Sequence, residues 1–359
     1  MLRTDSVRFL TVLGARPQFI KAAPLSAVLR RQYEEVIVHT GQHYDHQMSD
    51  VFFEQLGIPS PDHHLDVGSG SHGEQTGTML TRLEAVMQRE PPDVVLVFGD
   101  TNSTLAGALA AAKLNIPVAH VEAGLRSFNR AMPEEINRVM TDHLSTWLFA
   151  PSSHAERQLA TEGLSRGVHV VGDIMLDAVL QHAERARRSS PYPQAANVCA
   201  GMFYLCTVHR AENTDRPERL RGILEGLARL DQPVVLPLHP RTRKRLTEFG
   251  LTPGPNVRVI EPVGYLDMLQ LERSAAAILT DSGGVQKEAY YLEVPCVTLR
   301  EETEWVETTD IGWNALAGTD PDAIMAAVER HRQGRRPHPP LYGTGDTAER
   351  IVRVFAGAD

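Results

Sequence analysis

The sequence predicts an α/β protein built from two doubly wound parallel-sheet domains that face a central cleft. Short apolar runs of strand length alternate with helical patterns along the chain, which is typical of a parallel sheet covered on both faces. The alternation stops once, in the polar, proline-containing segment 183–201, and then restarts. The chain has 359 residues, whereas a single hydrophobic core stops growing at ~250–300 residues. We therefore expect two domains of similar size.

Each predicted strand is an apolar run that ends at a turn residue. In the first half these runs are 7–13, 35–40, 94–99, 118–123, 147–151 and 168–172. In the second half they are 202–209, 233–239, 257–262, 275–281 and 295–299. Helical patterns lie between them, as in 19–32 and 101–114, and an amphipathic helix is expected at 347–357. The segment 183–201 is typical of a linker.

Composition and charge narrow the class of protein. The net charge of -9 argues against a nucleic-acid partner, because phosphate backbones are bound by clustered Lys and Arg. No apolar run reaches the ~18 residues of a membrane span, and the N-terminal run has no signal-peptide cleavage pattern. Cys199, Cys206 and Cys296 are scattered, without metal or redox spacing. We expect a soluble, cytoplasmic protein with no membrane partner.

Histidines give the one pattern that suggests a metal. His39, His43 and His46 lie close to Asp45, but this segment crosses a strand-to-loop junction and lacks the i, i+4 spacing of helical metal sites. The pair 63–64 has no recognisable ligand spacing either. The sequence predicts no metal site.

The stretch 99–138 concentrates carboxylates where chemistry is expected. One predicted strand closes on Asp100, the next closes on Glu122, and a PEEINR helix start brings Glu134 and Glu135. In open α/β sheets, ligands bind outside the carboxyl ends of strands. One surface carboxylate alone is more often structural, but several that converge from neighbouring strand ends predict an acid/base site.

A second motif predicts an anion-binding site. A buried strand ends at Asp281, and Ser282, Gly283 and Gly284 begin a helix. Glycine lets a ligand approach the backbone, while the free amides and the helix dipole favour a phosphate. Glu288, on the second turn, is a candidate to bind ribose hydroxyls, although an exposed helical glutamate fits the spacing equally well.

Cations and one histidine at other strand ends fit the same ligand. Arg16 follows the first strand in a glycine turn, and Lys21 lies on the helix after it, so both are candidates to meet a diphosphate. His209 and Arg210 follow a strand of the second half. His209 is a candidate to orient or protonate a phosphate leaving group, whereas a lone histidine is usually structural. No GxGxxG fingerprint occurs, which argues against a nicotinamide cofactor.

Taken together, these motifs resemble the non-hydrolysing UDP-N-acetylglucosamine 2-epimerases. The matching segments run through nearly the whole chain in the family's order and spacing. They are GARPQFIK (14–21), HTGQHYD (39–45), GDTNSTLAGALAA (99–111), HVEAGLRS (120–127), PEEINR (133–138), HRAEN (209–213), LHPRTR (238–243), LTDSGGVQKEA (279–289) and TEWVET (303–308).

The resemblance implies the GT-B-like, two-domain fold that nucleotide-sugar glycosyltransferases and epimerases share. The first domain would span 1–183, with a C-terminal helix in 342–359 packed back on it, and the UDP-binding domain would span 184–341. The resemblance also implies a homodimer and a role in supplying precursors for surface polysaccharides.

The resemblance also assigns site residues. The family's catalytic residues match Asp100, Glu122, Glu134 and His209. Its substrate and UDP contacts match Arg16, Lys21, Gln42, His43, Arg210, Ser282, Gly283, Gly284 and Glu288. The family needs no cofactor: a base removes the C2 proton while UDP leaves C1, and UDP adds again to the 2-acetamidoglucal after C2 is protonated on its other face. Gln42 and His43 match a pair that binds a second, activating UDP-sugar in bacterial members.

The substrate sugar stays open between two branches of the family. GARPQFIK and TEWVET are similar to the branch that acts on UDP-2,3-diacetamido-2,3-dideoxyglucuronate, and Gln18 and Phe19 distinguish the first segment near its expected substrate end. Segments 68–77 and 132–143 are similar to archaeal UDP-N-acetylglucosamine epimerases.

Three other functions fit parts of the pattern. A UDP-sugar glycosyltransferase would share the architecture but would not need three acids around C2. A nucleotide-sugar sensor would keep the phosphate site without the set Asp100, Glu122, Glu134 and His209. A hydrolysing epimerase would release free sugar and UDP.

Overall fold

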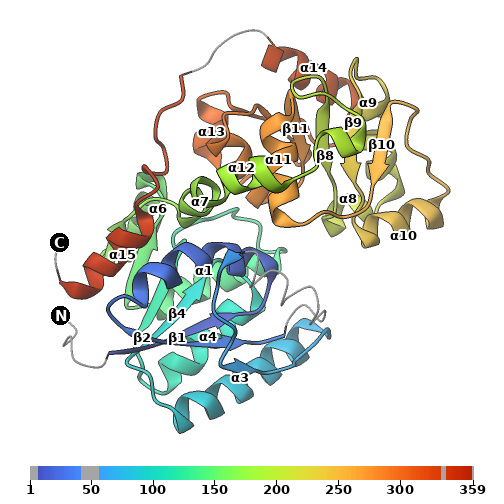
Figure 1. Ribbon diagram of the computed structural model, residues 1–359. Helices are drawn as coiled ribbons and strands as arrows, with labels where there is room; N and C mark the ends of the chain where they lie inside the picture. The colour runs from blue at the N-terminus through green and yellow to red at the C-terminus, as the bar shows by residue number, and fades with distance from the viewer. Residues whose placement is uncertain (1–6, 42–55, 333–336, 358–359) are drawn as a thin grey trace. The chain divides into compact units, whose positions relative to one another are not determined.

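The computed structural model describes residues 7–41, 56–332 and 337–357, and the chain folds as two compact units. Unit 1 comprises Met1–Leu180 and Pro340–Asp359, and unit 2 comprises Gln181–Pro339. Figure 1 shows both units, with labels on many of their strands and helices. Within the described part of the chain, no helix combines the length and hydrophobicity that crossing a bilayer requires.

The described residues of unit 1 form a seven-stranded sheet in the order β3-β2-β1-β4-β5-β6-β7, with every pair parallel. The strands are β1 (Arg8–Leu13), β2 (Glu34–His39), β3 (His63–His64), β4 (Val94–Phe98), β5 (Val118–Val121), β6 (Trp147–Ala150) and β7 (Val168–Val170). The helices are α1 (Arg16–Leu29), α3 (His72–Arg89), α4 (Asn102–Lys113), α5 (Pro133–Leu144), α6 (Ser153–Thr161), the first part of α7 (Ile174–Ser189) and α15 (Thr347–Ala356). Every residue of β4 is fully buried, as expected for a central parallel strand covered on both faces.

Unit 2 repeats this plan with six strands among its described residues, in the order β10-β9-β8-β11-β12-β13, again all parallel. The strands are β8 (Tyr204–Thr207), β9 (Val234–Pro237), β10 (Val257–Ile260), β11 (Ala277–Thr280), β12 (Cys296–Thr298) and β13 (Asn314–Leu316). The helices are α8 (Ala211–Thr214), α9 (Pro217–Ala228), α10 (Pro240–Phe249), α11 (Tyr265–Ser274), α12 (Gly283–Tyr291), α13 (Val306–Asp310) and α14 (Pro321–Arg332).

Each unit has its own hydrophobic core. In unit 1, Met79 and Leu83 of α3 pack with Val95 and Val97 of β4. In unit 2, residues of α9 and α14 pack over β9 and β11 in the same way. The prediction of two doubly wound parallel-sheet domains is therefore confirmed.

The strand order reverses at one point in each sheet. In unit 1 the chain crosses from one side to the other between β1 and β4, and in unit 2 between β8 and β11. At such a point, the connections that follow two neighbouring strands run in opposite directions, which leaves a crevice at the carboxyl ends of these strands. Ligands of doubly wound sheets bind in this crevice. These two switch points are the places in the fold where functional side chains are expected.

The predicted strands are all present, but the structure differs from the sequence analysis in two respects. The expected linker 183–201 is wrong in its first part, because α7 continues to Ser189. Glu184 stabilises this last turn by pairing with Arg187 and Arg188 at 2.7 and 2.8 Å. Two short edge strands, β3 and β13, were not predicted, since neither is a sustained apolar run.

The C-terminal helix α15 belongs to unit 1, where it packs against α1 (Figure 1, red). Phe355 of α15 is buried against three aromatic rings of the sheet. Its ring centroid lies 4.8 Å from that of Phe9, 5.5 Å from Trp147 and 5.4 Å from Phe149. A segment distant in sequence thus closes one face of the first domain's sheet.

Candidate active site

In the turn after β1, the backbone of Gly14 packs closely against two side-chain hydroxyls. A Cβ on Gly14 would lie 2.0 Å from Ser103 Oγ and 2.2 Å from Thr40 Oγ1, and these two hydroxyls are hydrogen-bonded to each other at 2.8 Å. Buried Gln18 completes the turn, because its Oε1 accepts from the backbone N–H groups of Gly14 and Ala15 at 2.8 and 3.1 Å. Gln18 therefore stabilises the turn itself.

The β4 and β5 ends carry the first two predicted acids. Glu122 follows β5 with a positive φ of 77° and forms a buried ion pair with Lys21 of α1. Gly99 lies beside this pair: a Cβ there would be 3.1 Å from Lys21 Nζ and 3.8 Å from Glu122 Oε2. The structure thus brings Lys21, Glu122 and the turn that leads to Asp100 together.

Asp100 is held in place by two residues of α5 that the sequence analysis did not single out. Arg138 donates from Nε to Asp100 Oδ2 at 2.9 Å, and Asn137 donates from Nδ2 to the Asp100 carbonyl at 2.9 Å. Both belong to the PEEINR motif, one turn after Glu134. Their i+3 and i+4 spacing from that acid was the available signal, since it places them on one side of the helix.

The two glutamates of the same motif differ in role. Glu135 is buried and accepts from Ser127 N at 2.8 Å, Phe128 N at 3.0 Å and Arg138 NH1 at 2.9 Å, so its carboxylate is committed to the fold. Glu134 is half-buried in the first turn of α5. Of the two, Glu134 is the more exposed.

In unit 2, Asp281 organises the switch point between β8 and β11. It is fully buried, and its carboxylate accepts from the backbone N–H of His209 at 3.1 Å and of Arg210 at 3.0 Å. His209 Nδ1 lies 3.1 Å from the same carboxylate, and Asn213 donates to it at 3.2 Å. Burial raises the pKa of Asp281, but the hydrogen bonds from His209, Arg210 and Asn213 outweigh burial and leave this pKa below its usual range. The turn is thereby fixed with the His209 ring partly exposed.

The start of α12 has the form of an anion site. Ser282 is its N-cap, and Gly283 and Gly284 occupy its first two positions. A Cβ on Gly283 would lie 3.5 Å from Trp305 Nε1, 3.9 Å from Glu304 Oε2 and 4.0 Å from Arg210 NH2. The Glu304 carboxylate is paired with Arg300 at 3.0 Å, so an indole N–H and a guanidinium are the donors that flank the helix start. Free amides, the helix dipole and these donors together favour a phosphate.

A cation–π pair between Lys287 and Trp305 stabilises the structure beside the start of α12. Lys287, on the next turn of α12, is almost fully buried, and its ammonium lies 4.1 Å from the centre of the Trp305 ring. Such a pair is strengthened by loss of solvent. Trp305 belongs to the TEWVET segment, so this contact fixes a residue from one of the motifs that carried the resemblance.

The remaining predicted residues have these positions. Glu288 of α12 is buried, and Arg16 is half-buried at the first position of α1. Gln42 and His43 lie outside the described residues. The predicted residues that are described therefore gather at two switch points, one in each unit.

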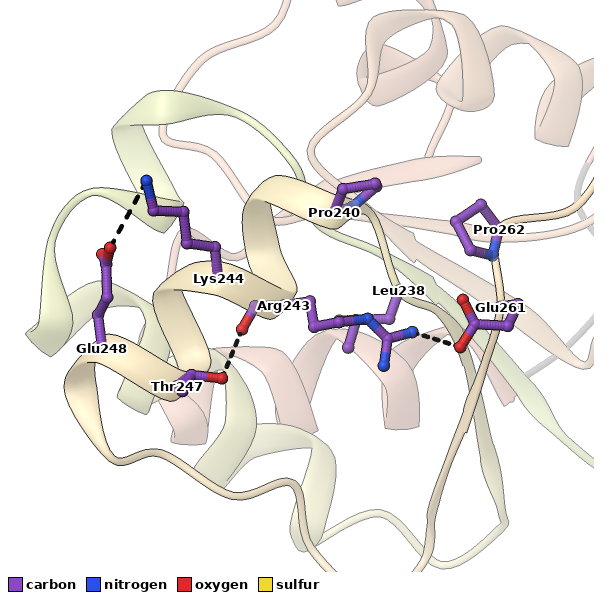
Figure 2. Close-up of a pocket in the computed structure, with 8 residues that line it drawn as sticks. All are labelled: Leu238, Pro240, Arg243, Lys244, Thr247, Glu248, Glu261 and Pro262. Carbon is purple, nitrogen blue, oxygen red and sulfur yellow. Dashed lines mark hydrogen bonds and ion pairs between the residues drawn. The ribbon is translucent and has the colours of Figure 1, made fainter. Parts of the chain in front are cut away.

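A further pocket lies beside α10 in unit 2 and has a volume of about 450 Å³ (Figure 2). Its two cations face carboxylates, Arg243 at 2.7 Å from Glu261 and Lys244 at 3.8 Å from Glu248. With its positive charge balanced in this way, the pocket is a weaker anion site than the start of α12. None of the predicted site residues lines it. Within the described ranges, no group of three or more His, Cys, Asp or Glu side chains is arranged to hold a metal ion.

A comparison with known proteins decides the family. A family model described as UDP-N-acetylglucosamine 2-epimerase matches residues 27–356, which include Asp100, Glu122 and the start of α12. The chain belongs to this family. The prediction of an epimerase, and hence an isomerase, is confirmed at that level.

Among curated members of the epimerase family, the UDP-2,3-diacetamido-2,3-dideoxy-D-glucuronate 2-epimerase of Pseudomonas aeruginosa is 51% identical, covering 98% of this chain and 99% of the relative. The UDP-N-acetylglucosamine 2-epimerase of Methanocaldococcus jannaschii is 48% identical over 96% of this chain and 97% of its own. The crystal structure of an epimerase from M. jannaschii, in complex with UDP-GlcNAc and UDP, matches with a TM-score of 0.91 at 46% identity, covering 98% and 99% of the two chains. The likeness to these epimerases thus extends over both units.

Proposed function

We propose that this epimerase interconverts UDP-N-acetylglucosamine and UDP-N-acetylmannosamine without hydrolysis and without a cofactor. The observation that carries the proposal is the gathering of Asp100 and Glu122 at neighbouring strand ends, with Glu134 on the helix that holds Asp100. Support for a UDP-sugar comes from the anion site of α12 and from the M. jannaschii epimerase, which binds UDP-GlcNAc and UDP.

The proposed reaction has two mirrored halves. A carboxylate of unit 1 takes the proton from C2, the C1–O bond breaks with its electron pair leaving on UDP, and a C1=C2 double bond forms. A carboxylic acid then protonates C2 from the opposite face while a UDP oxygen bonds to C1 again. Asp100, Glu122 and Glu134 share these proton transfers, and the C2 proton is weakly acidic, so the departing diphosphate must be stabilised at the same time.

Stabilisation of UDP is the task of unit 2 in this proposal. The helix start at Ser282, with the amides of Gly283 and Gly284, and the side chains of Arg210 and His209 receive the diphosphate, and Glu288 binds the ribose hydroxyls. In unit 1 we assign Arg16 and Lys21 as UDP-sugar contacts, with Lys21 also paired with Glu122. Gln42 and His43 bind UDP-sugar as well.

A second substrate, UDP-2,3-diacetamido-2,3-dideoxyglucuronate, is favoured by a specific observation. The relative named for this substrate is 51% identical to the chain, compared with 48% for the M. jannaschii epimerase. The mechanism would be the same, because C2 carries an acetamido group and C1 carries UDP in both substrates.

The test is proton NMR of the purified protein in D₂O with each UDP-sugar in a parallel tube. We expect deuterium to enter C2 together with a new manno-configured anomeric signal. The UDP-sugar that exchanges its C2 proton faster is identified as the substrate. Asp100→Asn should abolish both signals, whereas Glu156→Gln, an exposed acid on α6, should leave them unchanged.

Other outcomes identify the rival functions. Free N-acetylmannosamine and UDP would mark a hydrolysing epimerase, and tight UDP-sugar binding without exchange would mark a sensor. Sugar transfer to an acceptor without C2 exchange would mark a glycosyltransferase. The homodimer, the cytoplasmic location and the supply of polysaccharide precursors stay predictions, and sedimentation of the purified protein tests the first of them.

A further inference from the structure

A fully buried histidine lies between the two strand ends that carry Asp100 and Glu122. His120, on β5, has no exposed side-chain surface. Its Nε2 lies 2.8 Å from the carbonyl oxygen of Gly99, and its Nδ1 lies 2.7 Å from Asp142 Oδ1. Both ring nitrogens thus face oxygen atoms at short hydrogen-bond distances.

The partners of His120 determine where its protons are. A backbone carbonyl can only accept, so Nε2 carries a proton. Asp142 is held as an anion, because its second oxygen accepts from Arg126 NH1 at 2.7 Å and from Gly124 N at 3.1 Å. A carboxylate anion accepts from Nδ1, so Nδ1 carries a proton as well.

The surrounding charges are consistent with a cation at this position. Arg126 is itself bound by Glu162 through two bonds of 2.8 Å, and these bonds lower the pKa of Glu162 to about 2. Charges then alternate along the chain of contacts His120, Asp142, Arg126, Glu162. The other charged groups beside the Gly99 turn are engaged with one another: Lys21 with Glu122, and Arg138 with both Asp100 and Glu135. With a neutral His120, the contact chain Asp142, Arg126, Glu162 would carry one uncompensated negative charge, and its inner members Asp142 and Arg126 are almost fully buried, where such a charge is costly.

We infer that His120 is a positioning residue, held as a doubly protonated imidazolium that ties the Gly99–Asp100 turn to the strand bearing Glu122. The backbone N–H of Gly99 is bound to β5 as well, donating to Val121 O at 3.0 Å. With both polar groups of Gly99 fixed to β5, the Asp100 carboxylate and Glu122 keep one mutual geometry. His120 acts only through this turn, because no substrate reaches a side chain with no exposed surface.

The catalytic part of this inference rests on the proposed function, whereas the protonation state does not. A first experiment therefore needs no substrate: long-range ¹H–¹⁵N correlation spectra of ¹⁵N-histidine-labelled wild-type protein at pH 8. His120→Gln identifies the His120 signals by their loss. We expect both ring nitrogens of His120 in the protonated range at this pH, and Asp142→Asn should return one of them to the unprotonated range.

A second experiment measures kcat and KM for C2 exchange in His120→Gln. Displacement of a catalytic group by about 1 Å can cost about 100-fold, so we expect kcat to fall roughly 10- to 100-fold with KM changed by less than about twofold. The matched control is His331→Gln, since His331 is also buried and also bonds a backbone carbonyl, that of Cys296 at 2.8 Å in unit 2. The control should lose thermal stability to a similar extent but keep its kcat.

Two results would overturn the inference: an unprotonated ring nitrogen on His120 in the wild type, or a folded His120→Gln variant with unchanged kcat. If the wild type exchanges neither UDP-sugar at C2, the proposed function fails instead. In that case the NMR signal of the Asp100 backbone amide still tests whether His120 positions the turn. Its chemical shift should change in His120→Gln and stay unchanged in His331→Gln.

Discussion

The turn after β1, at the first switch point, has no room for a side chain at Gly14. An added methyl group would overlap the hydroxyls of Ser103 and Thr40, which are 2.0 and 2.2 Å from its position and are bonded to each other. We expect Gly14→Ala to lower the free energy of unfolding by about 1–3 kcal/mol, as overpacked cores do, in urea titrations followed by circular dichroism.

The matched control is Gly77→Ala in the exposed middle of α3. A Cβ on Gly77 has no neighbour within 4 Å, and alanine in a helix interior is favoured over glycine by about 0.5–1 kcal/mol. A stabilised Gly77→Ala beside a destabilised Gly14→Ala would attribute the difference to the close approach. An unchanged Gly14→Ala would show that the turn relaxes freely.

At the residue scale, the sequence predicted where the strand-end carboxylates lie better than which residues hold them. Asp100 and Glu122 were predictable because each follows an apolar run that ends abruptly in a turn. Arg138 and Asn137 were not assigned a role, because a helix start with charged residues looks the same whether its side chains reach a catalytic turn or solvent. Only tertiary packing brings α5 against the end of β4.

At the element scale, α7 carries a buried histidine that makes stability depend on pH. Burial, with a smaller effect of Arg185, lowers the pKa of His182 to about 4. The usual pKa of histidine is about 6.5, so below this pH the His182 ring binds a proton in the unfolded chain. In the folded chain the same ring stays neutral until the pH falls to about 4. The contribution of His182 to the free energy of unfolding is therefore fully present above pH 6.5 and decreases as the pH falls towards 4.

His182→Leu should remove this dependence. Between pH 7 and pH 5 we expect the wild type to lose about 1–2 kcal/mol more unfolding free energy than the variant, since one pKa unit corresponds to about 1.4 kcal/mol. Urea titrations at both pH values measure it. His64→Leu, at an exposed position, should follow the wild type, and equal losses in all three proteins would refute the assignment.

The course of α7 also explains why the linker prediction was partly wrong. Polar composition and nearby prolines are typical of linkers, but Glu, Ala and Arg are also good helix formers. Ala186 is fully buried and Glu184 pairs with two arginines, so local pairing and packing extend the helix to Ser189. Sequence composition alone does not distinguish a polar helix from a polar loop.

At the scale of the whole molecule, the two sheets share an order that the sequence did not reveal. Periodicity predicted strands and helices in alternation, which fixes the class of fold. Strand order depends on pairings between segments distant in sequence, so the switch points became visible only in the assembled sheets. The predicted functional residues lie at these points because parallel strands end there together.

The contribution of α15 to unit 1 can be tested at its aromatic contact. Phe355→Ala leaves a cavity between Phe9, Trp147 and Phe149, and a buried Phe→Ala change costs about 3–5 kcal/mol. Hydrogen exchange followed by mass spectrometry should show faster exchange in β1 and β6, with unit 2 unchanged. The control is Arg353→Ala, an exposed position of the same helix. Equal exchange in both variants would contradict the role of Phe355.

The position of α15 also gives the molecule an order of assembly on the ribosome. The strands of unit 1 are synthesised first, but the helix that covers Phe9 and Phe149 is synthesised only after all of unit 2. At ~5–20 residues per second this interval lasts on the order of 10–30 s, during which an aromatic face of the nascent chain is open to water and to chaperones. The domain that begins first is therefore the one completed last.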